Sequence, residues 1–333
     1  MHVLVNGVRL FFDVEGGKLA PDGPTMREKP TLILLHGGPG FDHTIFKPAY
    51  SALADIAQVV YLDHRGNGRS DAGPKEAWTL AQWGDDVRGF CDALGIEKPV
   101  VLGVSFGGMV AMSYTTRHPD HPSKLILITT EAKGDSYLER RAELFEKLGG
   151  PEVGALARRR FLEIGEQTNE AAVAKWRTLA MPHYTRRSRA EAIGRGIVRQ
   201  DVLQWFTRPK DGEGDRFNFL PDLHRISSPT LVMGGEDDPM TPIEAQIDIA
   251  AALPRHLRAL RAVLGLRARN HRGSARTRPR ADSGLHHVVM ITPPRRAPGS
   301  ASRRSNPSRP ARRPCGAARP RAPAPSRRLP ARR

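Results

Sequence analysis

Short apolar runs alternate with polar, helix-compatible stretches along the first part of the chain. Four such runs precede residue 130, at residues 31–35, 58–62, 99–102 and 125–128. Short runs that are almost wholly apolar are typical of parallel strands covered on both faces. The stretch 80–94 carries apolar residues at helical spacing, and Gly95 is a natural helix stop. Repeated strand and helix units therefore predict an α/β fold, a mostly parallel sheet flanked by helices.

Two local elements are added near the amino terminus. Residues 3–5 and 8–14 flank an Asn-Gly pair at positions 6 and 7, which supplies the positive φ angles of a two-residue turn. We therefore expect a β-hairpin there. A mixed polar and apolar stretch at 44–56 predicts a helix.

The alternation stops at residue 131 and resumes near residue 229. Residues between these points are charged and helical in pattern, without a convincing strand, whereas 229–233 reads as a strand and 242–253 as a helix. An insertion after the carboxyl end of a strand is expected to lie over an active site as a lid. The expected domains are an α/β core of 1–130 and 224–257, a helical lid of 131–223, and a tail of 258–333.

Charge separates the tail from the rest of the chain. The formal net charge is +17, but residues 256–333 hold 21 arginines, no lysine and one acid, a net of +20, while residues 1–255 carry a net of −3. From Pro293 onward there is too much proline and charge to pack, so we expect this tail to be largely disordered. Its arginines could attract nucleic acid or anionic membrane, but no aromatic residues are interleaved for base stacking. We interpret this charge as accidental, with no specific nucleic-acid or membrane partner.

Cysteine content and hydropathy suggest a cytoplasmic protein. The two cysteines, Cys91 and Cys315, cannot make a disulfide framework and suit a reducing compartment. No apolar run approaches the roughly 18 residues that span a bilayer, and no basic segment followed by an apolar stretch begins the chain.

The candidate chemistry is centred on residues 103–107, G-V-S-F-G, which lie between an apolar run and a helix-prone stretch. A G-x-S-x-G sequence in this context is typical of a nucleophile elbow, where a sharp strand-to-helix turn exposes the serine. Ser105 is therefore the candidate nucleophile. A glycine-rich turn with an incidental serine is the alternative reading.

A second glycine-rich segment follows the run 31–35. Residues 36–40 read H-G-G-P-G, and a backbone without side chains can turn an N–H group inward. Acyl transfer needs such donors around a developing oxyanion, together with a nucleophile, a base and an acid that orients the base. A purely structural turn is the alternative for this segment alone, but two motifs at the ends of two predicted strands favour the catalytic interpretation.

These two motifs, together with D-H-R-G-N-G-R-S at residues 63–70, resemble the α/β-hydrolase superfamily and, within it, the proline iminopeptidase branch. The resemblance covers about residues 1–255. Related esterases and amidases also carry H-G-G-P-G, and the branch more usually has Gln at the position of His64. The resemblance implies an α/β-hydrolase fold, Ser105 as nucleophile, and the amides of Gly38 and Phe106 as the oxyanion hole.

The resemblance also implies the acid of the triad. Asp238 is preferred to Asp237 because the family pattern places the acid four residues before the proline that is Pro242 here. The alternative is that both aspartates cap the helix that follows. Members of this branch recognise the substrate amine with acidic lid residues. Four lid glutamates are available here, and none is assigned: Glu131, Glu139, Glu143 and Glu163.

The histidine departs from the family pattern, which places it in a glycine-rich loop about thirty residues beyond the acid. Residues 258–271 read RALRAVLGLRARNH and lack those glycines. One permitted coding of this peptide, read one nucleotide later, gives ARFERFSGCGHGI, which looks like the family's last strand and histidine loop. We therefore hypothesise a frameshift near Leu257, with the missing histidine across the codons of Ala268 and Arg269.

In the chain as it stands, His271 is the nearest substitute, 33 residues past Asp238, and His286 and His287 are later candidates. Loss of one triad member typically costs several orders of magnitude in turnover, so impaired activity is expected.

The sequence thus predicts a serine hydrolase of small amides or esters, most similar to a proline iminopeptidase, that acts on a small molecule or short peptide through an acyl-enzyme. An esterase or lactonase of the same fold, a catalytically dead ligand-binding homologue, and a nucleic-acid binder that uses the arginine tail are the alternatives. No cofactor is expected, and no metal, since no histidine and acid cluster has ligand spacing. The sequence does not specify an oligomeric state.

Overall fold

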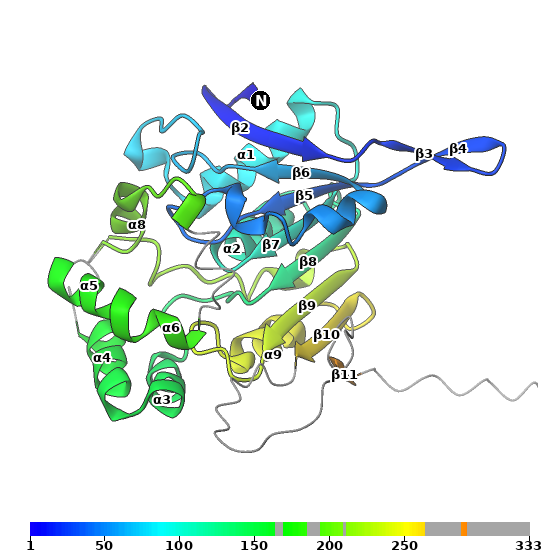
Figure 1. The fold of residues 1–333 in the computed structure, drawn as a ribbon. Coiled ribbons are helices and arrows are strands. Elements are labelled where there is room, and N and C mark those ends of the chain that lie inside the picture. The colour runs from blue at the N-terminus through cyan, green and yellow to red at the C-terminus, as the bar shows by residue number, and fades with distance from the viewer. Residues whose placement is uncertain (164–168, 185–193, 209–210, 264–287, 292–333) are drawn as a thin grey trace, which may run out of the picture. The chain divides into compact units, whose positions relative to one another are not determined.

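One sheet of nine strands runs through the residues that the computed structural model describes, which are 1–163, 169–184, 194–208, 211–263 and 288–291 (Figure 1). Its strands are β1 (His2–Val5), β2 (Val8–Glu15), β5 (Thr31–Leu35), β6 (Gln58–Leu62), β7 (Val100–Val104), β8 (Lys124–Ile128), β9 (Thr230–Gly235), β10 (Arg258–Val263) and β11 (Val288–Ile291). They lie in the order β1-β2-β6-β5-β7-β8-β9-β10-β11.

The strands from β6 to β10 in this order are parallel, and β1, β2 and β11 pair antiparallel at the two ends. The predicted α/β fold with a mostly parallel sheet is therefore confirmed, as is the amino-terminal hairpin. Val104 pairs with Ile128, and Ile128 with Met233, so β7, β8 and β9 end at the same edge of the sheet. Loops that follow these three strands are neighbours in space.

Side-chain alternation along the strands divides the core into two layers. Ile33 and Leu35 pack on one face with α1 (Leu80–Ala93), α2 (Phe106–Arg117) and α9 (Ile243–Ala252). Leu32 and Leu34 pack on the other face, against residues such as Phe46. Because successive side chains of a strand point to opposite faces, a wholly apolar run is needed to fill both layers.

The helix expected over 44–56 is wrong. Two short 3-10 helices occupy this stretch instead, η1 (His43–Phe46) and η2 (Ser51–Asp55), with Pro48 between them. Proline has no backbone N–H to donate and its ring clashes with the preceding turn, so Pro48 disfavours a continuous α-helix through this stretch.

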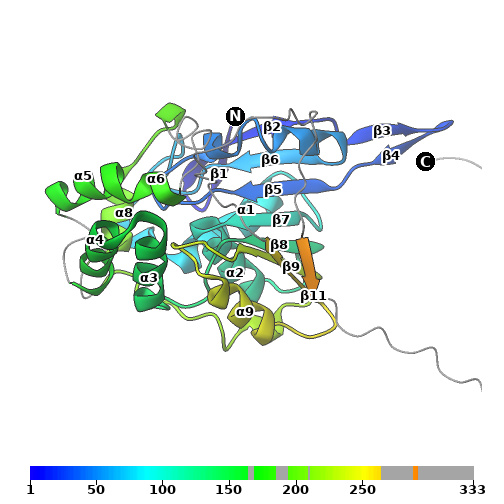
Figure 2. The ribbon, with the colours of Figure 1, turned by 60° about the horizontal axis from the view of Figure 1, so that its bottom comes forward.

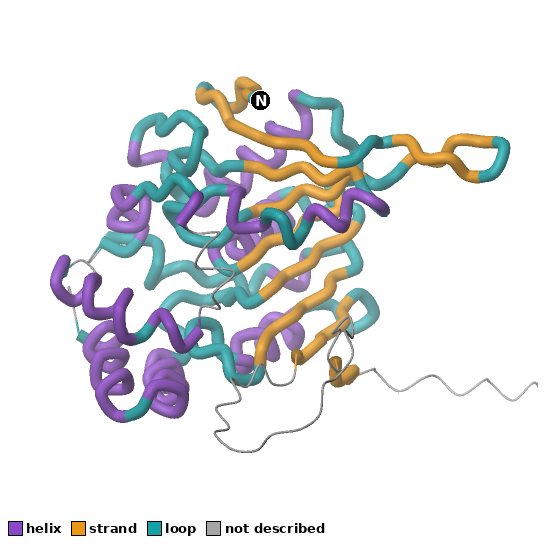
Figure 3. The backbone as a smooth tube through the Cα atoms, viewed as in Figure 1, coloured by secondary structure: helices purple, strands orange, loops and turns teal. Residues whose placement is uncertain are grey.

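The insertion between β8 and β9 is helical. It contains α3 (Leu138–Gly149), α4 (Pro151–Leu162), α5 (Glu170–Leu179), α6 (Met181–Tyr184) and α8 (Gln200–Phe206). These helices gather beyond the edge where the parallel strands end (Figures 1 and 3). The insertion has an apolar cluster of its own, in which Phe145 stacks edge-on with Trp176 at 4.7 Å between ring centroids.

Two features depart from the sequence-based expectation. A two-stranded hairpin, β3 (Leu19–Asp22) with β4 (Thr25–Glu28), projects from the sheet (Figure 2). The sequence does not predict this hairpin, because its residues mix polar and apolar types without an alternating pattern and are mostly exposed. The sheet also continues past residue 257, where β10 pairs in parallel with β9. The arginines at positions 258 and 261 interrupt the apolar pattern that identified the other parallel strands.

Candidate active site

The turn between β7 and α2 holds Ser105 in a strained backbone conformation. Its φ is +53° and its ψ is −120°, in the region that L-residues with a side chain rarely occupy. The Ser105 N–H donates to the carbonyl of Ile128 at 3.0 Å, so the turn is tied to the end of β8. Strain of this kind persists only where the surroundings enforce it, and it is concentrated at functional sites.

The glycines of the elbow, residues 103–107, are required by close backbone contacts. A Cβ added at Gly103 would lie 2.3 Å from the carbonyl oxygen of Gly107, and one added at Gly107 would lie 2.0 Å from the carbonyl oxygen of Leu35. Both distances are far below van der Waals contact with rigid main chain. The G-x-S-x-G pattern is therefore a packing requirement of this turn against the ends of β5 and β7.

The glycine-rich segment after β5 lies against the same turn. A Cβ added at Gly37 would sit 3.5 Å from the Cβ of Ser105. Gly38 has φ +141° and Gly40 has φ +95°, so the segment adopts a backbone path that favours glycine. The structure thus brings residues 37–41, called here the oxyanion loop, next to the elbow, and the oxyanion role of the Gly38 and Phe106 amides remains a prediction.

Asp238 lies in the loop that follows β9, at the sheet edge where β7 also ends. Its carboxylate accepts hydrogen bonds from the backbone N–H groups of Met240 and Thr241, at 2.9 and 3.1 Å, and from the Thr241 hydroxyl at 3.1 Å. These bonds fix the carboxylate within the turn before α9. The neighbouring Asp237 instead pairs with Lys147 of the helical insertion at 2.7 Å.

A chain of hydrogen bonds connects the elbow with the Asp238 loop. The Thr130 hydroxyl donates to the carbonyl of Ser105 at 2.7 Å, and the Gln246 side-chain amide donates to the carbonyl of Thr130 at 2.8 Å. The same Gln246 nitrogen lies 3.4 Å from the carbonyl oxygen of Thr241. Sequence analysis identified neither Thr130 nor Gln246, because their importance depends on contacts between distant parts of the chain.

The predicted base, His271, lies outside the described residues, as do His286 and His287. Two other histidines are buried near the elbow. His36 donates through Nδ1 to the carbonyl of Gly37 at 2.8 Å, and its Nε2 accepts the N–H of His64 at 3.3 Å. This arrangement requires a neutral His36 ring, in agreement with burial, which lowers the pKa of His36.

His64 packs its ring edge-on against Phe106, with centroids 5.6 Å apart. Its Nε2 is buried and has no hydrogen-bond partner among the described residues. Burial lowers the pKa of His64 well below the usual range, and the neighbouring His36 lowers it further.

Asp42, His43 and Asp63 form a buried cluster whose candidate ligand atoms lie within 4.8 Å of one another. Sequence spacing did not suggest this cluster. Asp63 accepts hydrogen bonds from the backbone N–H and Nδ1 of His43, both at 2.8 Å, and from the Arg69 N–H at 3.0 Å. The Arg69 guanidinium lies 2.8 Å from Asp42. Protein N–H groups and a cation of the chain therefore already engage these carboxylates, which favours a structural role.

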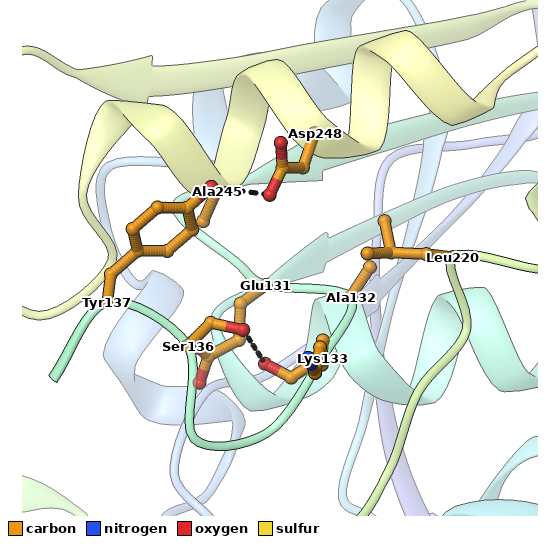
Figure 4. A pocket seen from close by; sticks show the side chains of 8 residues that line it. All are labelled: Glu131, Ala132, Lys133, Ser136, Tyr137, Leu220, Ala245 and Asp248. Atoms are coloured by element: carbon orange, nitrogen blue, oxygen red, sulfur yellow. Dashed lines mark hydrogen bonds between the residues drawn. The ribbon is translucent and has the colours of Figure 1, made fainter.

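A small pocket opens where the insertion leaves the sheet, and Figure 4 shows its lining. It is lined by Glu131, Ala132, Lys133, Ser136, Tyr137, Leu220, Ala245 and Asp248. Tyr137 donates to Asp248 of α9 at 2.5 Å, which joins the start of the insertion to the core.

Glu131 is the buried member of the four lid glutamates, whereas Glu139, Glu143 and Glu163 are exposed. Its carboxylate pairs with the buried Arg141. Burial raises the pKa of Glu131, and the nearby Arg141 offsets this effect in part. Any amine that bound to Glu131 would have to compete with this guanidinium.

Within the described part of the chain, no helix combines the length and the apolar character needed to cross a membrane.

Comparison with known proteins gives consistent matches. A family model described as the alpha/beta hydrolase fold matches residues 30–262. RutD of Caulobacter sp. (strain K31), provisionally named a carbamate hydrolase, is 28% identical over 74% of this chain and 84% of its own length. Proline iminopeptidase of Lactobacillus helveticus (strain DPC 4571) is 28% identical over 66% of this chain and 78% of its own length. The crystal structure of proline iminopeptidase from Mycobacterium smegmatis has a TM-score of 0.63 at 22% identity, covering 80% of this chain and 90% of that one.

Proposed function

Since the chain belongs to the α/β-hydrolase fold family, we propose that it is a serine hydrolase that cleaves a small amide or ester through an acyl-enzyme at Ser105. Membership confirms the resemblance and the fold expected from the sequence. The observation that carries the proposal is the strained φ of +53° at Ser105, in a turn that joins a strand to a helix at the edge where the parallel strands end.

In the proposed mechanism the Ser105 hydroxyl attacks the substrate carbonyl and gives its proton to a histidine held by Asp238. The oxyanion accepts hydrogen bonds from the N–H groups of Gly38 and Phe106. The histidine then passes its proton to the leaving group, and the acyl-enzyme forms. Water, deprotonated by the same histidine, attacks the acyl carbon and releases Ser105. His271 is the residue proposed for this role, with residues 131–223 as a lid over the site.

The favoured substrate is a peptide with an amino-terminal proline. The proline iminopeptidase relatives support this choice, and the H-G-G-P-G segment agrees with it, although related esterases and amidases also carry that segment. The carbamate hydrolase name of RutD also describes cleavage at a carbonyl carbon bonded to a heteroatom, which suits the same nucleophile.

Active-site labelling tests the nucleophile. A fluorophosphonate should modify Ser105 of the intact chain and leave the Ser105→Ala variant unmodified, with mass spectrometry of the labelled peptide as the readout. If both proteins label equally, or neither labels, the catalytic proposal is wrong and a ligand-binding homologue is favoured. Release of naphthylamine from proline naphthylamide, without turnover of nitrophenyl acetate, would separate the iminopeptidase from an esterase or lactonase.

We also propose that the carboxyl-terminal segment results from a frameshift near Leu257. Sequencing the coding DNA tests this directly, and a single uninterrupted frame with no alternative homologous reading would reject it. A chain rebuilt with the shifted frame carries the family histidine and should label at Ser105 faster than the present chain, in which His271 is only the nearest substitute in sequence.

A further inference from the structure

We propose that Asn67 is a positioning residue for the oxyanion loop, and the proposal rests on the function given above. Asn67 belongs to the segment 63–70, which is distinctive in the sequence but has no part in the catalytic steps. Its side-chain Oδ1 accepts a hydrogen bond from the backbone N–H of Gly40 at 2.7 Å. Asn67 is fully buried, so water cannot take over this bond in the folded protein.

The other end of the Asn67 side chain is also fixed. Its Nδ2 donates to the carbonyl of Arg65 at 2.8 Å. The two neighbours are an N–H donor and a C=O acceptor, so a flipped amide would lose both bonds. Asn67 therefore presents an oxygen to the oxyanion loop in one orientation.

Arg65 anchors this arrangement to helix α1. Its Nε and Nη2 each lie 2.7 Å from the carboxylate oxygens of Asp86, in a bidentate pair in which both side chains are about 3% exposed. The indole N–H of Trp83 donates to the carbonyl of Arg65 at 3.0 Å, on the same carbonyl that Asn67 uses. Asn67 is thus supported by a rigid, buried part of the core.

Two glycines of the oxyanion loop cannot hold its backbone through side-chain packing. Gly38 and Gly40 adopt positive φ angles and carry no side chains that could pack. On its other side, the carbonyl of Gly40 accepts the N–H of Arg199 from the helical insertion at 2.7 Å. Asn67 therefore fixes the N–H group of Gly40, whereas Arg199 fixes its carbonyl group. Gly40 lies two residues after Gly38, the proposed oxyanion donor. Misplacement of a catalytic group by 1 Å can cost about 100-fold in rate.

The test compares Asn67→Ala with Ser70→Ala in the full chain. Ser70 is a matched control, because it is buried in the same segment and its hydroxyl accepts the N–H of Phe11 at 2.9 Å and donates to the carbonyl of Asp63 at 2.7 Å, neither of which belongs to the oxyanion loop. Its backbone N–H, which donates to the carbonyl of Asn67 at 3.0 Å, is kept in Ser70→Ala. Amide hydrogen exchange is measured for the peptide that covers residues 36–43, together with the rate of Ser105 labelling.

In Asn67→Ala we expect exchange at the Gly40 amide to accelerate about 10-fold or more, and Ser105 labelling to slow by about 10- to 100-fold. For turnover of proline naphthylamide we expect kcat to fall and KM to stay nearly unchanged, as when an interaction made only in the transition state is lost. Ser70→Ala should show neither effect. In a Gly38→Ala background the Asn67→Ala change should add no further loss of rate, because both act through one donor.

Equal exchange of residues 36–43 in the two variants overturns the role of Asn67, whatever the activity. Faster exchange with an unchanged labelling rate also overturns it, since positioning would then have no catalytic effect. A wild-type chain that shows no labelling at Ser105 argues against the proposed function instead, and the exchange data still decide whether Asn67 holds the loop.

Discussion

The side-chain amide of Gln246 donates a hydrogen bond to the carbonyl oxygen of Thr130 at 2.8 Å, and both residues are fully buried. They are 116 positions apart in the chain and come from the helix after β9 and the loop after β8. Because Thr130 also bonds the Ser105 carbonyl, Gln246 sets the distance between the elbow and the loop that carries Asp238. The relative placement of two proposed triad members therefore depends on a side chain that touches neither.

Replacement of Gln246 by Ala should weaken this link. We expect the free energy of unfolding to fall by about 1–3 kcal/mol, because the buried carbonyl of Thr130 loses a partner. Urea denaturation measures this loss, and the Ser105 labelling rate should fall in parallel. Ile247→Ala on the same helix is the control, since that side chain is 48% exposed. Equal losses in the two variants would contradict the proposed link.

Gly103→Ala should severely destabilise the protein. The new Cβ would lie 2.3 Å from the Gly107 carbonyl oxygen, which is main chain and cannot move aside cheaply. We expect a loss of more than about 2 kcal/mol, measured by urea denaturation. Gly194→Ala provides the comparison, since nothing lies within 4 Å of a Cβ there. A Gly103→Ala protein as stable as Gly194→Ala would show that the elbow is less tightly packed than described.

Stability should decrease as the pH falls below about 6.5. Burial lowers the pKa values of His36 and His64, so the unfolded chain binds protons that the folded chain does not. This stabilising contribution is complete above the unfolded pKa and is lost as the pH falls through and below it. Each histidine adds at most about 1.4 kcal/mol per pH unit to the slope of the unfolding free energy against pH.

His64→Gln should reduce the slope of the unfolding free energy against pH by the contribution of His64, since glutamine does not titrate. Urea denaturation at pH 7.5, 6.5 and 5.5 gives the slopes. Ser70→Ala, which removes no titratable group, should keep the wild-type slope. An identical slope in the His64→Gln variant would mean that His64 is protonated equally in both states.

Gly40→Ala should displace the helical insertion from the oxyanion loop. A Cβ at this position would lie 2.5 Å from the Arg199 carbonyl oxygen, and φ is +95°. We expect faster limited proteolysis between residues 194 and 208, mapped by mass spectrometry. In Gly38→Ala the Cβ instead meets the N–H groups of Gly40 and Phe41, within the loop itself. Cleavage in the insertion should therefore increase more in Gly40→Ala than in Gly38→Ala. The opposite order would contradict the contact between Gly40 and Arg199.

The sequence predicted the parts of the fold that depend on local pattern. Residues 31–35 and 58–62 are strands as expected, because an apolar run buried on both faces has few other solutions. The G-x-S-x-G turn was also recognisable, since its glycines are required by contacts within a few residues and with the neighbouring strand. The helix predicted over 44–56 is absent because Pro48 interrupts the apolar pattern, and two 3-10 helices form on either side of it.

The supporting contacts of the site were not predictable in the same way. Asn67 bonds Gly40 across 27 positions, and Gln246 bonds Thr130 across 116. Asn67 lies in the motif of residues 63–70 and Gln246 in a predicted helix, but neither pattern indicates the bonding partner, because each contact forms only when the sheet brings distant loops together. The catalytic histidine stays a prediction. The sequence offers His271 as the nearest substitute for the family histidine, and His271 lies outside the described residues.

The helical insertion contacts the oxyanion loop and the adjoining residue Asp42 through main-chain N–H groups. Arg199 donates its N–H to the Gly40 carbonyl at 2.7 Å, and Ile197 donates its N–H to the Asp42 carboxylate at 3.0 Å. Every residue except proline offers the same donor. Insertions of quite different sequence could therefore be exchanged between relatives and still dock, provided that neither donor position becomes proline. Substrate range could thus diversify in this fold without change to the residues that carry out the chemistry.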